Sequence, residues 1–345
     1  MLCALRPQLP GKMYFTEIYL FTTNCYTDSC NCIELGIICF CVRLIRLSPQ
    51  ELCLPAPATT LDQQLVRCQS HRNHSPVIII GMHRSGTTLL SRLLESLGLF
   101  LGRTKDENHE ATFFQSTNDW LLRLAGGAWD NPAPITYLLE NPQMRDKTTD
   151  YIRRYLLASP RAVSYLGWWN YLRYRRIGLA SAPWGWKDPR NTFTLPLWLD
   201  IFPEAKVIHL HRSGVDVALS LRRRGRREYR LQRFYRSLPL LHWIRPKRGG
   251  FVDSLRCDRL DAGLALWREY VEQGGCHVAM LKERAFEVSF ESLVREPALT
   301  LSALSKFCDL RVDPLAINRA CEQIDTAVLP SGPDSQLYCP ALRSS

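Results

Sequence analysis

The segment between Pro76 and Leu99 constrains the fold more than any other, because it predicts a strand, a tight loop and a helix in direct succession. Residues 77–80 form a short apolar run, which is typical of a strand buried on both faces of a parallel sheet. A loop with two glycines follows, and residues 88–99 then place leucines at helical spacing, with Gly98 near the end of the helix. A chain built around such a unit is expected to belong to the α/β class.

Two further strands are predicted at residues 206–210 (KVIHL) and 285–290, each followed by a loop and a helix. The helices predicted after them cover residues 215–223 and begin near Pro297. Strands that alternate with helices predict a three-layer α/β domain, in which helices flank a central parallel sheet. Ligands of such sheets bind at the carboxyl ends of the strands, so we expect the site at the edge that contains Gly81 and His211.

The first 72 residues differ from the rest of the 345-residue chain, because they are rich in Cys, Thr, Tyr and Pro and show no sustained helical or strand period. We expect residues 1–72 to form a poorly ordered, Cys-rich extension. Residues 73–325 are then expected to form one domain, and residues 326–345 a C-terminal tail.

Eight of the thirteen cysteines precede residue 69. Their number is odd and no secretory signal precedes them, which argues against a disulfide framework. The closest pairs follow a CxC spacing rather than CxxC, and the first histidine is His71, which argues against a zinc site. These features predict reduced thiols, a cytoplasmic location and no metal.

The best candidate for a membrane segment is the apolar run at residues 35–42. It is far shorter than the roughly 20 residues that a spanning helix needs. The sequence therefore predicts no transmembrane segment, while a peripheral contact of this run with a membrane surface stays open.

The loop after the first strand, GMHRSGTT at residues 81–88, has the composition of an anion cradle. Its backbone N–H groups and the dipole of the following helix favour negative charge. The spacing is similar to the phosphate-binding pattern GxxxxGK[ST], but Thr87 occupies the lysine position and no acid pair for magnesium lies nearby. A nucleotide with a shorter, less charged tail than ATP is therefore expected. The candidate ligand-binding residues are His83, Arg84, Ser85, Gly86, Thr87 and Thr88.

A second candidate anion site follows the strand at residues 206–210. Arg212 opens the turn, and Ser220 lies eight residues later on the predicted helix. A guanidinium fork and a hydroxyl can converge on one anion if that helix returns beside the loop.

These two motifs, in this order, resemble those of sulfotransferases, including the bacterial, protein-tyrosine and carbohydrate enzymes. The resemblance extends over about residues 76–312. It implies a P-loop-like fold and 3′-phosphoadenosine 5′-phosphosulfate (PAPS) as sulfuryl donor. It further implies that the first loop binds the 5′-phosphosulfate, that Arg212 and Ser220 bind the 3′-phosphate, and that Lys187, at a strand end because Pro189 follows, contacts the sulfuryl oxygens.

Sulfuryl transfer by in-line displacement would then proceed without a metal, with Arg84 and Lys187 stabilising the developing negative charge. The acceptor hydroxyl or amine needs a general base. The candidates are Glu110, which is favoured, then His109, with Glu107 as a third. Relatives often have an acid in a region that here contains Gln115, which cannot act as a base, so the base assignment stays open.

The net charge of +11 is concentrated between Arg222 and Arg248, where eleven Lys or Arg accompany one acid, Glu228. This run is interpreted as a solvated surface or as a site for an anionic or carbohydrate acceptor. Lys247, Arg248 and Gly249 resemble a late 3′-phosphate loop of the family, at an unexpectedly early position. Aromatic residues interleave with the cations, but no recognised nucleic-acid fold surrounds them, so no nucleic-acid partner is expected.

Two other functions remain consistent with the sequence. One is a nucleoside or small-molecule kinase with a variant phosphate loop, which the missing lysine disfavours. The other is a basic nucleic-acid or membrane-surface binding protein with a vestigial nucleotide fold, whose affinity would fall steeply with salt.

Overall fold

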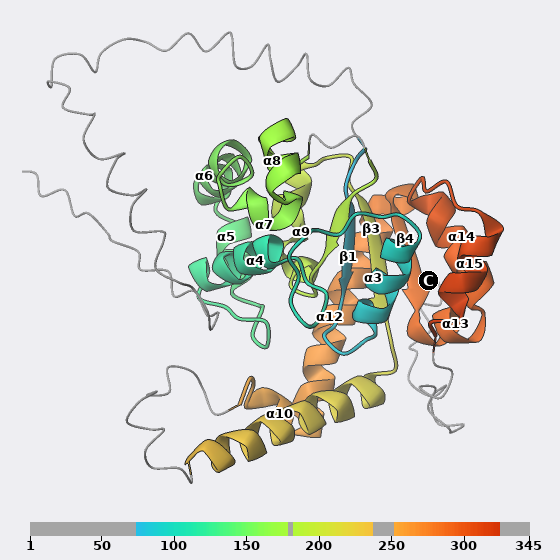
Figure 1. The fold of residues 1–345 in the computed structure, drawn as a ribbon. Coiled ribbons are helices and arrows are strands. Elements are labelled where there is room, and N and C mark those ends of the chain that lie inside the picture. Colours follow the sequence, from blue (N-terminus) through green and yellow to red (C-terminus); the bar gives the residue numbers. More distant parts are fainter. Residues whose placement is uncertain (1–73, 179–181, 237–251, 325–345) are drawn as a thin grey trace, which may run out of the picture. The chain divides into compact units, whose positions relative to one another are not determined.

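The computed structural model describes residues 74–178, 182–236 and 252–324, apart from the side chains of residues 232–236 (Figure 1). All of them belong to one compact unit, Gln64–Ser345. The Cys-rich extension at 1–72 with its apolar run 35–42, the tail at 326–345 and the segment Lys247–Gly249 lie outside the described residues.

A four-stranded parallel sheet forms the centre of the domain. Its strands are β1 (Val77–Gly81), β2 (Gly185–Lys187), β3 (Lys206–His211) and β4 (Ala285–Ser289), in the order β2-β1-β3-β4. The strands predicted at 77–80, 206–210 and 285–290 are thereby confirmed. Lys187 ends β2, as the nearby Pro189 predicted, and the carboxyl ends of β1 and β3 lie side by side, because Gly81 pairs with Leu210.

Alternate residues of β1 face opposite layers of the domain, because successive side chains of a strand point to opposite faces. Ile78 and Ile80 pack with residues of α9 (Asn191–Ile201) and α12 (Leu260–Leu281). Val77 and Ile79 pack with residues of α3 (Thr87–Ser96) and α14 (Pro297–Phe307). Helices thus cover both faces, which confirms the predicted three-layer α/β fold (Figure 1).

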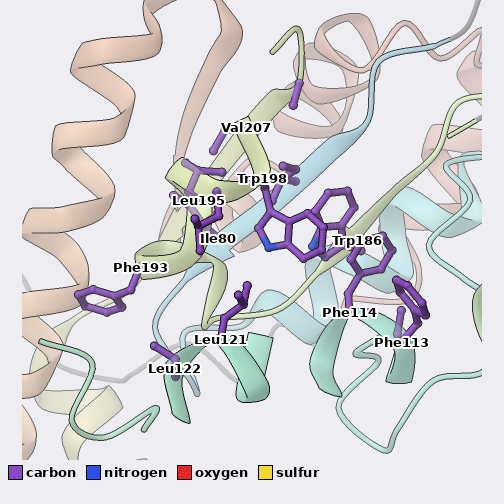
Figure 2. Packing of buried hydrophobic residues seen from close by; sticks show 14 of the residues in the cluster. Ile80, Phe113, Phe114, Leu121, Leu122, Trp186, Phe193, Leu195, Trp198 and Val207 are labelled. Carbon is purple, nitrogen blue, oxygen red and sulfur yellow. The ribbon is translucent and has the colours of Figure 1, made fainter. Parts of the chain in front are cut away.

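An aromatic cluster fixes the short strand β2 to the helical layer (Figure 2). The ring of Phe114 stacks on Trp186 with centroids 3.9 Å apart, and Trp198 meets both rings edge-on. Offset and edge-to-face aromatic pairs contribute about 0.5–1.5 kcal/mol each beyond their burial. The residue after Trp186 is Lys187, so this packing holds the end of β2, where that lysine lies.

The remaining elements surround the sheet. They are α4 (Thr112–Leu124), α5 (Ile135–Leu139), α6 (Pro142–Tyr151), η2 (Ile152–Leu156), α7 (Ala162–Leu166), α8 (Trp168–Tyr174), α10 (Gly214–Arg236), η3 (Arg256–Asp258), η4 (Lys282–Arg284), α13 (Phe290–Arg295) and α15 (Pro314–Cys321). Within the described ranges, no helix combines the length and the apolar character that crossing a membrane requires.

Two predicted helices differ in length from those observed. The helix expected at 88–99 ends at Ser96, because Leu97 caps it and Gly98 takes a left-handed φ of 101°. The helix expected at 215–223 continues to Arg236, since arginine and leucine are good helix formers and only Gly225 interrupts them within the predicted basic run.

Candidate active site

The loop between β1 and α3 has the backbone of an anion cradle. Arg84 and Gly86 both have left-handed φ angles, 70° and 97°, which turn the chain sharply. Gly86 is the N-cap of α3 and provides no side-chain cap, so the first N–H groups of the helix are open to a ligand. The hydroxyl of Ser85 is buried and has no hydrogen-bond partner among the described residues. A buried polar atom of this kind indicates a site that a polar ligand completes.

Phe290, the first residue of α13, packs against both strand-end loops. A Cβ atom added to Gly86 would lie 2.2 Å from Cδ2 of Phe290, so the loop can pass over the ring only at a glycine. The guanidinium carbon of Arg212 lies 4.5 Å from the centroid of the same ring. One aromatic side chain therefore supports the phosphate loop and the arginine of the second predicted anion site.

Arg212 follows β3 directly, and neighbouring helices hold its backbone. Its carbonyl accepts from Trp267 Nε1 at 3.0 Å, and the next amide, Ser213 N, donates to Glu291 Oε1 at 3.1 Å. Arg212 Nη2 lies 3.7 Å from Asp216, while its Nε is buried without a partner among the described residues. The side chain thus retains a donor for a ligand.

Ser220 lies on α10 and contacts the phosphate loop, because Arg84 Nε donates to Ser220 Oγ at 3.0 Å. The structure therefore joins the two predicted anion sites through this pair. Partial desolvation, followed by the charges of Arg224 and Arg212, lowers the pKa of Arg84 from its ordinary value. Three guanidinium groups are thus near enough to interact at the carboxyl edge of the sheet.

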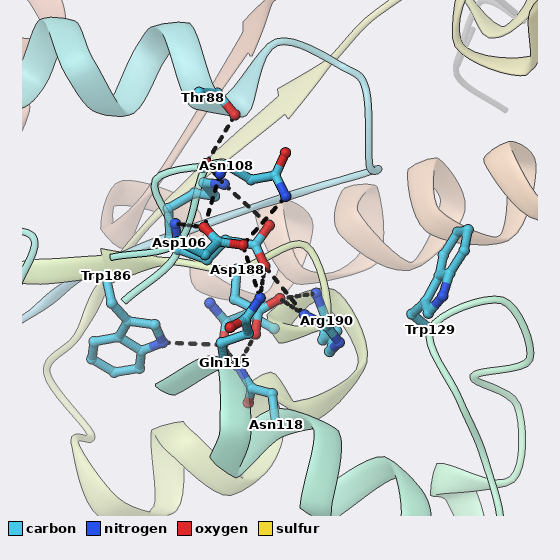
Figure 3. Close-up of polar contacts among 12 residues, drawn as sticks. Thr88, Asp106, Asn108, Gln115, Asn118, Trp129, Trp186, Asp188 and Arg190 are labelled. Atoms are coloured by element: carbon cyan, nitrogen blue, oxygen red, sulfur yellow. Dashed lines mark hydrogen bonds and ion pairs between the residues drawn. The ribbon is translucent and has the colours of Figure 1, made fainter. Parts of the chain in front are cut away.

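Figure 3 shows a buried polar network that includes Asn108, Asp188 and Arg190. Lys187 belongs to this network. The side chain is 1% exposed, and its Nζ donates to the Asn108 carbonyl and to Glu110 Oε1, the latter at 3.2 Å. Arg190 Nη1 donates to Glu110 Oε2 at 3.2 Å and to Asp188 Oδ1 at 3.1 Å. Two cations and two carboxylates thereby neutralise one another, as buried charges require.

Burial raises the pKa of Glu110 above its ordinary value of 4.5, and the charge of Asp188 acts in the same direction. Lys187 and Arg190 oppose this shift. A carboxylate with a raised pKa accepts a proton more readily than an ordinary surface glutamate.

The loop at residues 106–110 positions Glu110 and directs the three candidate base side chains to different surroundings. Asp106 Oδ1 accepts from the amides of Asn108 and Glu110, at 2.9 and 2.7 Å. Among the three candidates, Glu110 alone contacts Lys187 in the described structure. His109 instead faces α3, with Nδ1 3.7 Å from Glu95, and Glu107 is exposed.

The remaining loop candidates lie at the start of α3. Thr87 is buried, at the position where the related pattern has lysine, and Thr88 Oγ1 donates to the Asn108 carbonyl at 2.9 Å. The imidazole of His83 meets Trp129 edge-on with centroids 4.8 Å apart. Burial, and then the charges of Arg190 and other nearby cations, lower the pKa of His83 well below 6.5, so this side chain is neutral at pH 7.

Four residues of the site received no role from the sequence alone: Asn118, Asp188, Arg190 and Arg224. Asn118 is fully buried on α4 and donates to Asp188 Oδ2 at 2.9 Å. Arg224 lies one turn beyond Ser220 on α10 and pairs with Asp253 at 2.7 Å. Two sequence signals could have identified these residues. One is an amide on the apolar face of α4, and the other is the pair of charged residues that flank Pro189. Within the described ranges, no three His, Cys, Asp or Glu side chains gather as metal ligands would.

Comparisons with known proteins agree with this architecture. The model of the sulfotransferase family matches residues 76–314. A sulfotransferase domain from the curacin biosynthetic pathway is 16% identical, with a TM-score of 0.41, and the match covers 73% of this chain and 79% of that chain. A sulfotransferase from Alicyclobacillus acidocaldarius is also 16% identical, with a TM-score of 0.37 and coverage of 76% and 88%.

The sulfotransferase STF1 from Mycobacterium tuberculosis H37Rv is 15% identical, with a TM-score of 0.38 and coverage of 76% and 74%. No curated protein sequence matches the chain. The family model spans well over half of the chain, including both strand-end loops and the Lys187 network. The chain belongs to the sulfotransferase family.

Proposed function

We propose that this protein transfers a sulfuryl group from PAPS to a hydroxyl or amine of an acceptor. The observation that carries the proposal is the hydrogen bond of 3.0 Å between Arg84 Nε and Ser220 Oγ. It connects the loop after β1 to the helix after β3, so one ligand with two separate anionic groups can contact both. PAPS has two such groups, a 5′-phosphosulfate and a 3′-phosphate.

The polar atoms of the site fit such a ligand. The uncapped start of α3 and the unpartnered hydroxyl of Ser85 suit the 5′-phosphosulfate. The unpartnered Nε of Arg212, together with Ser220, suits the 3′-phosphate. Thr87 replaces the lysine that grips the β- and γ-phosphates of ATP, which favours PAPS over ATP.

When bound, PAPS supplies an activated sulfuryl group whose leaving group is the 5′-phosphate. Arg84 and the N–H groups of the loop are proposed to stabilise the charge that develops on that phosphate. Lys187 has three N–H donors, of which two bind Asn108 and Glu110, so the third is proposed to contact the sulfuryl oxygens. Lys187 is preorganised by the network, because it donates to Glu110, which Arg190 also binds.

Glu110 is proposed as the general base that accepts the proton of the acceptor. Two observations support it over His109: its carboxylate adjoins Lys187, and its pKa is raised by burial. His109 pairs with Glu95 on α3 and stays the second candidate.

An anionic acceptor, such as an acidic carbohydrate, is the class that the surface beyond the site favours. Exposed arginines continue along α10 past Ser220, at positions 223, 226, 227 and 230. A row of cations leading away from a site attracts anionic substrates and raises their local concentration.

Calorimetry with 3′-phosphoadenosine 5′-phosphate (PAP), AMP and ATP tests the donor site. We expect micromolar binding of PAP, much weaker binding of AMP and ATP, and loss of the preference for PAP in Arg212→Ala. Arg295→Ala, at an exposed arginine of α13, is the matched control and should bind as the wild type does. Equal or tighter binding of ATP would favour the kinase alternative. No nucleotide binding would favour the basic binding protein, whose affinity for a polyanion should survive Arg84→Ala.

A further inference from the structure

Helix α8, Trp168–Tyr174, has an apolar surface that the described residues leave open. Trp169 is 82% exposed, Trp168 is 60% exposed and Leu172 is 38% exposed. None of the seven residues of α8 is buried. Large aromatic side chains are normally mostly buried, since full burial of a large apolar side chain stabilises by about 1.5–3 kcal/mol. Two adjacent exposed tryptophans therefore indicate a surface that contacts another body.

The opposite side of α8 is hydrogen-bonded to the domain, so the apolar surface faces outward. Tyr171 Oη donates to the Ala158 carbonyl at 3.2 Å. Just beyond the helix, Ile177 N donates to the Leu157 carbonyl at 3.0 Å, and Arg176 Nη2 donates to the Arg153 carbonyl at 2.6 Å. The tryptophans are thus presented by a helix that is hydrogen-bonded to the domain at its middle and through the residues that follow it.

The segment that contains the exposed indoles is rich in arginine. Residues 151–178 contain six arginines and no Asp or Glu. Trp169 and Arg173 are four residues apart, as are Trp168 and Leu172, so each pair shares a face of α8. Arg173 and Arg175 are exposed, and no described acidic residue pairs with either. We call Trp168, Trp169, Leu172, Arg173 and Arg175 the α8 surface.

The α8 surface lies away from the candidate active site. Tyr165, three residues before α8, donates from its hydroxyl to the carbonyl of Gly185, the first residue of β2, at 2.6 Å. The phosphate loop instead follows the carboxyl end of β1, and Figure 1 shows α8 at the end of the domain where β1 begins. An acceptor bound at α8 would therefore not lie beside the sulfuryl donor.

We propose that the α8 surface docks onto the interface of an anionic lipid bilayer. Indole rings partition to the level of the lipid head groups, because one part of the ring is apolar and the N–H is polar. Arginines beside them bind the negative head groups. The α8 surface carries indoles and arginines but no acidic side chain. It is therefore complementary to the head-group region of an anionic bilayer.

Sedimentation of the full chain with vesicles tests this proposal. The vesicles contain phosphatidylcholine alone or phosphatidylcholine with 30% phosphatidylserine, in roughly 0.1 M salt, where surface charges are still felt over about 10 Å. We expect the wild type to bind the anionic vesicles, and Trp168→Ala/Trp169→Ala and Arg173→Glu/Arg175→Glu each to reduce the partition coefficient by about tenfold or more. The matched charge control is Arg295→Glu/Arg319→Glu, at exposed arginines of α13 and α15, which should bind like the wild type.

Thermal unfolding and PAP binding, measured on the same preparations, report folding and the donor site separately. Loss of vesicle binding with an unchanged melting temperature and unchanged PAP affinity supports the proposal. Absence of wild-type binding to anionic vesicles overturns it. Equal binding by wild type and α8 variants also overturns it, since another part of the chain then makes the contact. Binding to a soluble sulfated polysaccharide but not to vesicles identifies a polyanion site instead.

Discussion

Arg84 and Ser220 are 136 residues apart in the chain, yet the Nε of the arginine donates to the serine hydroxyl at 3.0 Å. The pair joins the phosphate loop to α10. Its two members are also the residues that the proposed function assigns to different ends of the sulfuryl donor.

Replacing this serine tests whether it binds the 3′-phosphate. We expect Ser220→Ala to weaken PAP binding by about 10- to 100-fold, because a hydrogen bond to a charged group contributes roughly 1.5–3 kcal/mol. AMP lacks the 3′-phosphate, so its affinity should stay unchanged, which makes it the control ligand. Calorimetric titration of both nucleotides gives the comparison. An equal loss for PAP and AMP would mean that the serine acts through Arg84 alone.

Lys187 and Glu110 form a buried ion pair. Removing one partner should lower both the stability and the activity, and these two effects can be measured separately. Lys187→Met leaves the Glu110 carboxylate with Arg190 as a cationic partner, so we expect the free energy of unfolding to fall by about 1–3 kcal/mol, the cost of a buried polar group that loses a partner. The double variant Lys187→Met/Glu110→Gln removes both charges and should recover most of that stability, but none of the activity. Denaturant unfolding and initial rates measure the two properties. Additive stability losses would contradict the coupling.

The pH dependence of transfer tests Glu110 as the base. Only the carboxylate form accepts a proton, and burial raises the pKa of Glu110 above 4.5. Activity should therefore fall as the pH drops through that raised pKa, and be retained above it. Glu110→Gln should lose about 10²–10⁴-fold in rate and lose this acidic limb.

The exposed Glu107 provides the matched control for this experiment, because Glu107→Gln removes one carboxyl from the same loop. Its pH profile should equal that of the wild type. Rates are measured with radiolabelled PAPS and an acceptor found by screening. If His109→Asn removes the acidic limb and Glu110→Gln keeps it, the histidine is the base.

Substituting Gly86 and Gly98 distinguishes the cost of a steric contact from the cost of backbone strain. Gly86 and Gly98 have similar φ angles, 97° and 101°, but a Cβ at Gly86 would meet Phe290 at 2.2 Å, while one at Gly98 would meet nothing within 4 Å. Gly98→Ala should cost only the left-handed backbone penalty, about 1 kcal/mol. Gly86→Ala should cost several kcal/mol and abolish PAP binding. Equal melting temperatures for the two variants would rule out the predicted role of Phe290.

The sequence predicted the sheet well because its signals are local. Residues 77–80 are a continuous apolar run, as expected of a strand covered on both faces, and Pro189 marks the end of β2. The phosphate loop and Arg212 were found for the same reason, since each directly follows such a strand.

Other features of the site depend on contacts between distant segments. The pairing of Lys187 with Glu110 spans 77 residues and requires that the loop at 106–110 fold over the end of β2. No periodicity in the sequence indicates a contact between residues so far apart in the chain. The role of Arg190, and the exposure of Trp168 and Trp169, are likewise set by tertiary packing, because composition alone predicts that tryptophans are buried.

The parallel order β2-β1-β3-β4 has a consequence for how the site comes into existence. Each of β2, β1 and β3 ends in a cation-bearing segment, and strands that are neighbours in this part of the sheet lie far apart in the chain, so none of these contacts can form early and locally. A partly folded chain therefore has no binding site at all. Nucleotide affinity in this protein would then report the population of the fully native state, and the ligand would raise stability in proportion to the logarithm of its concentration.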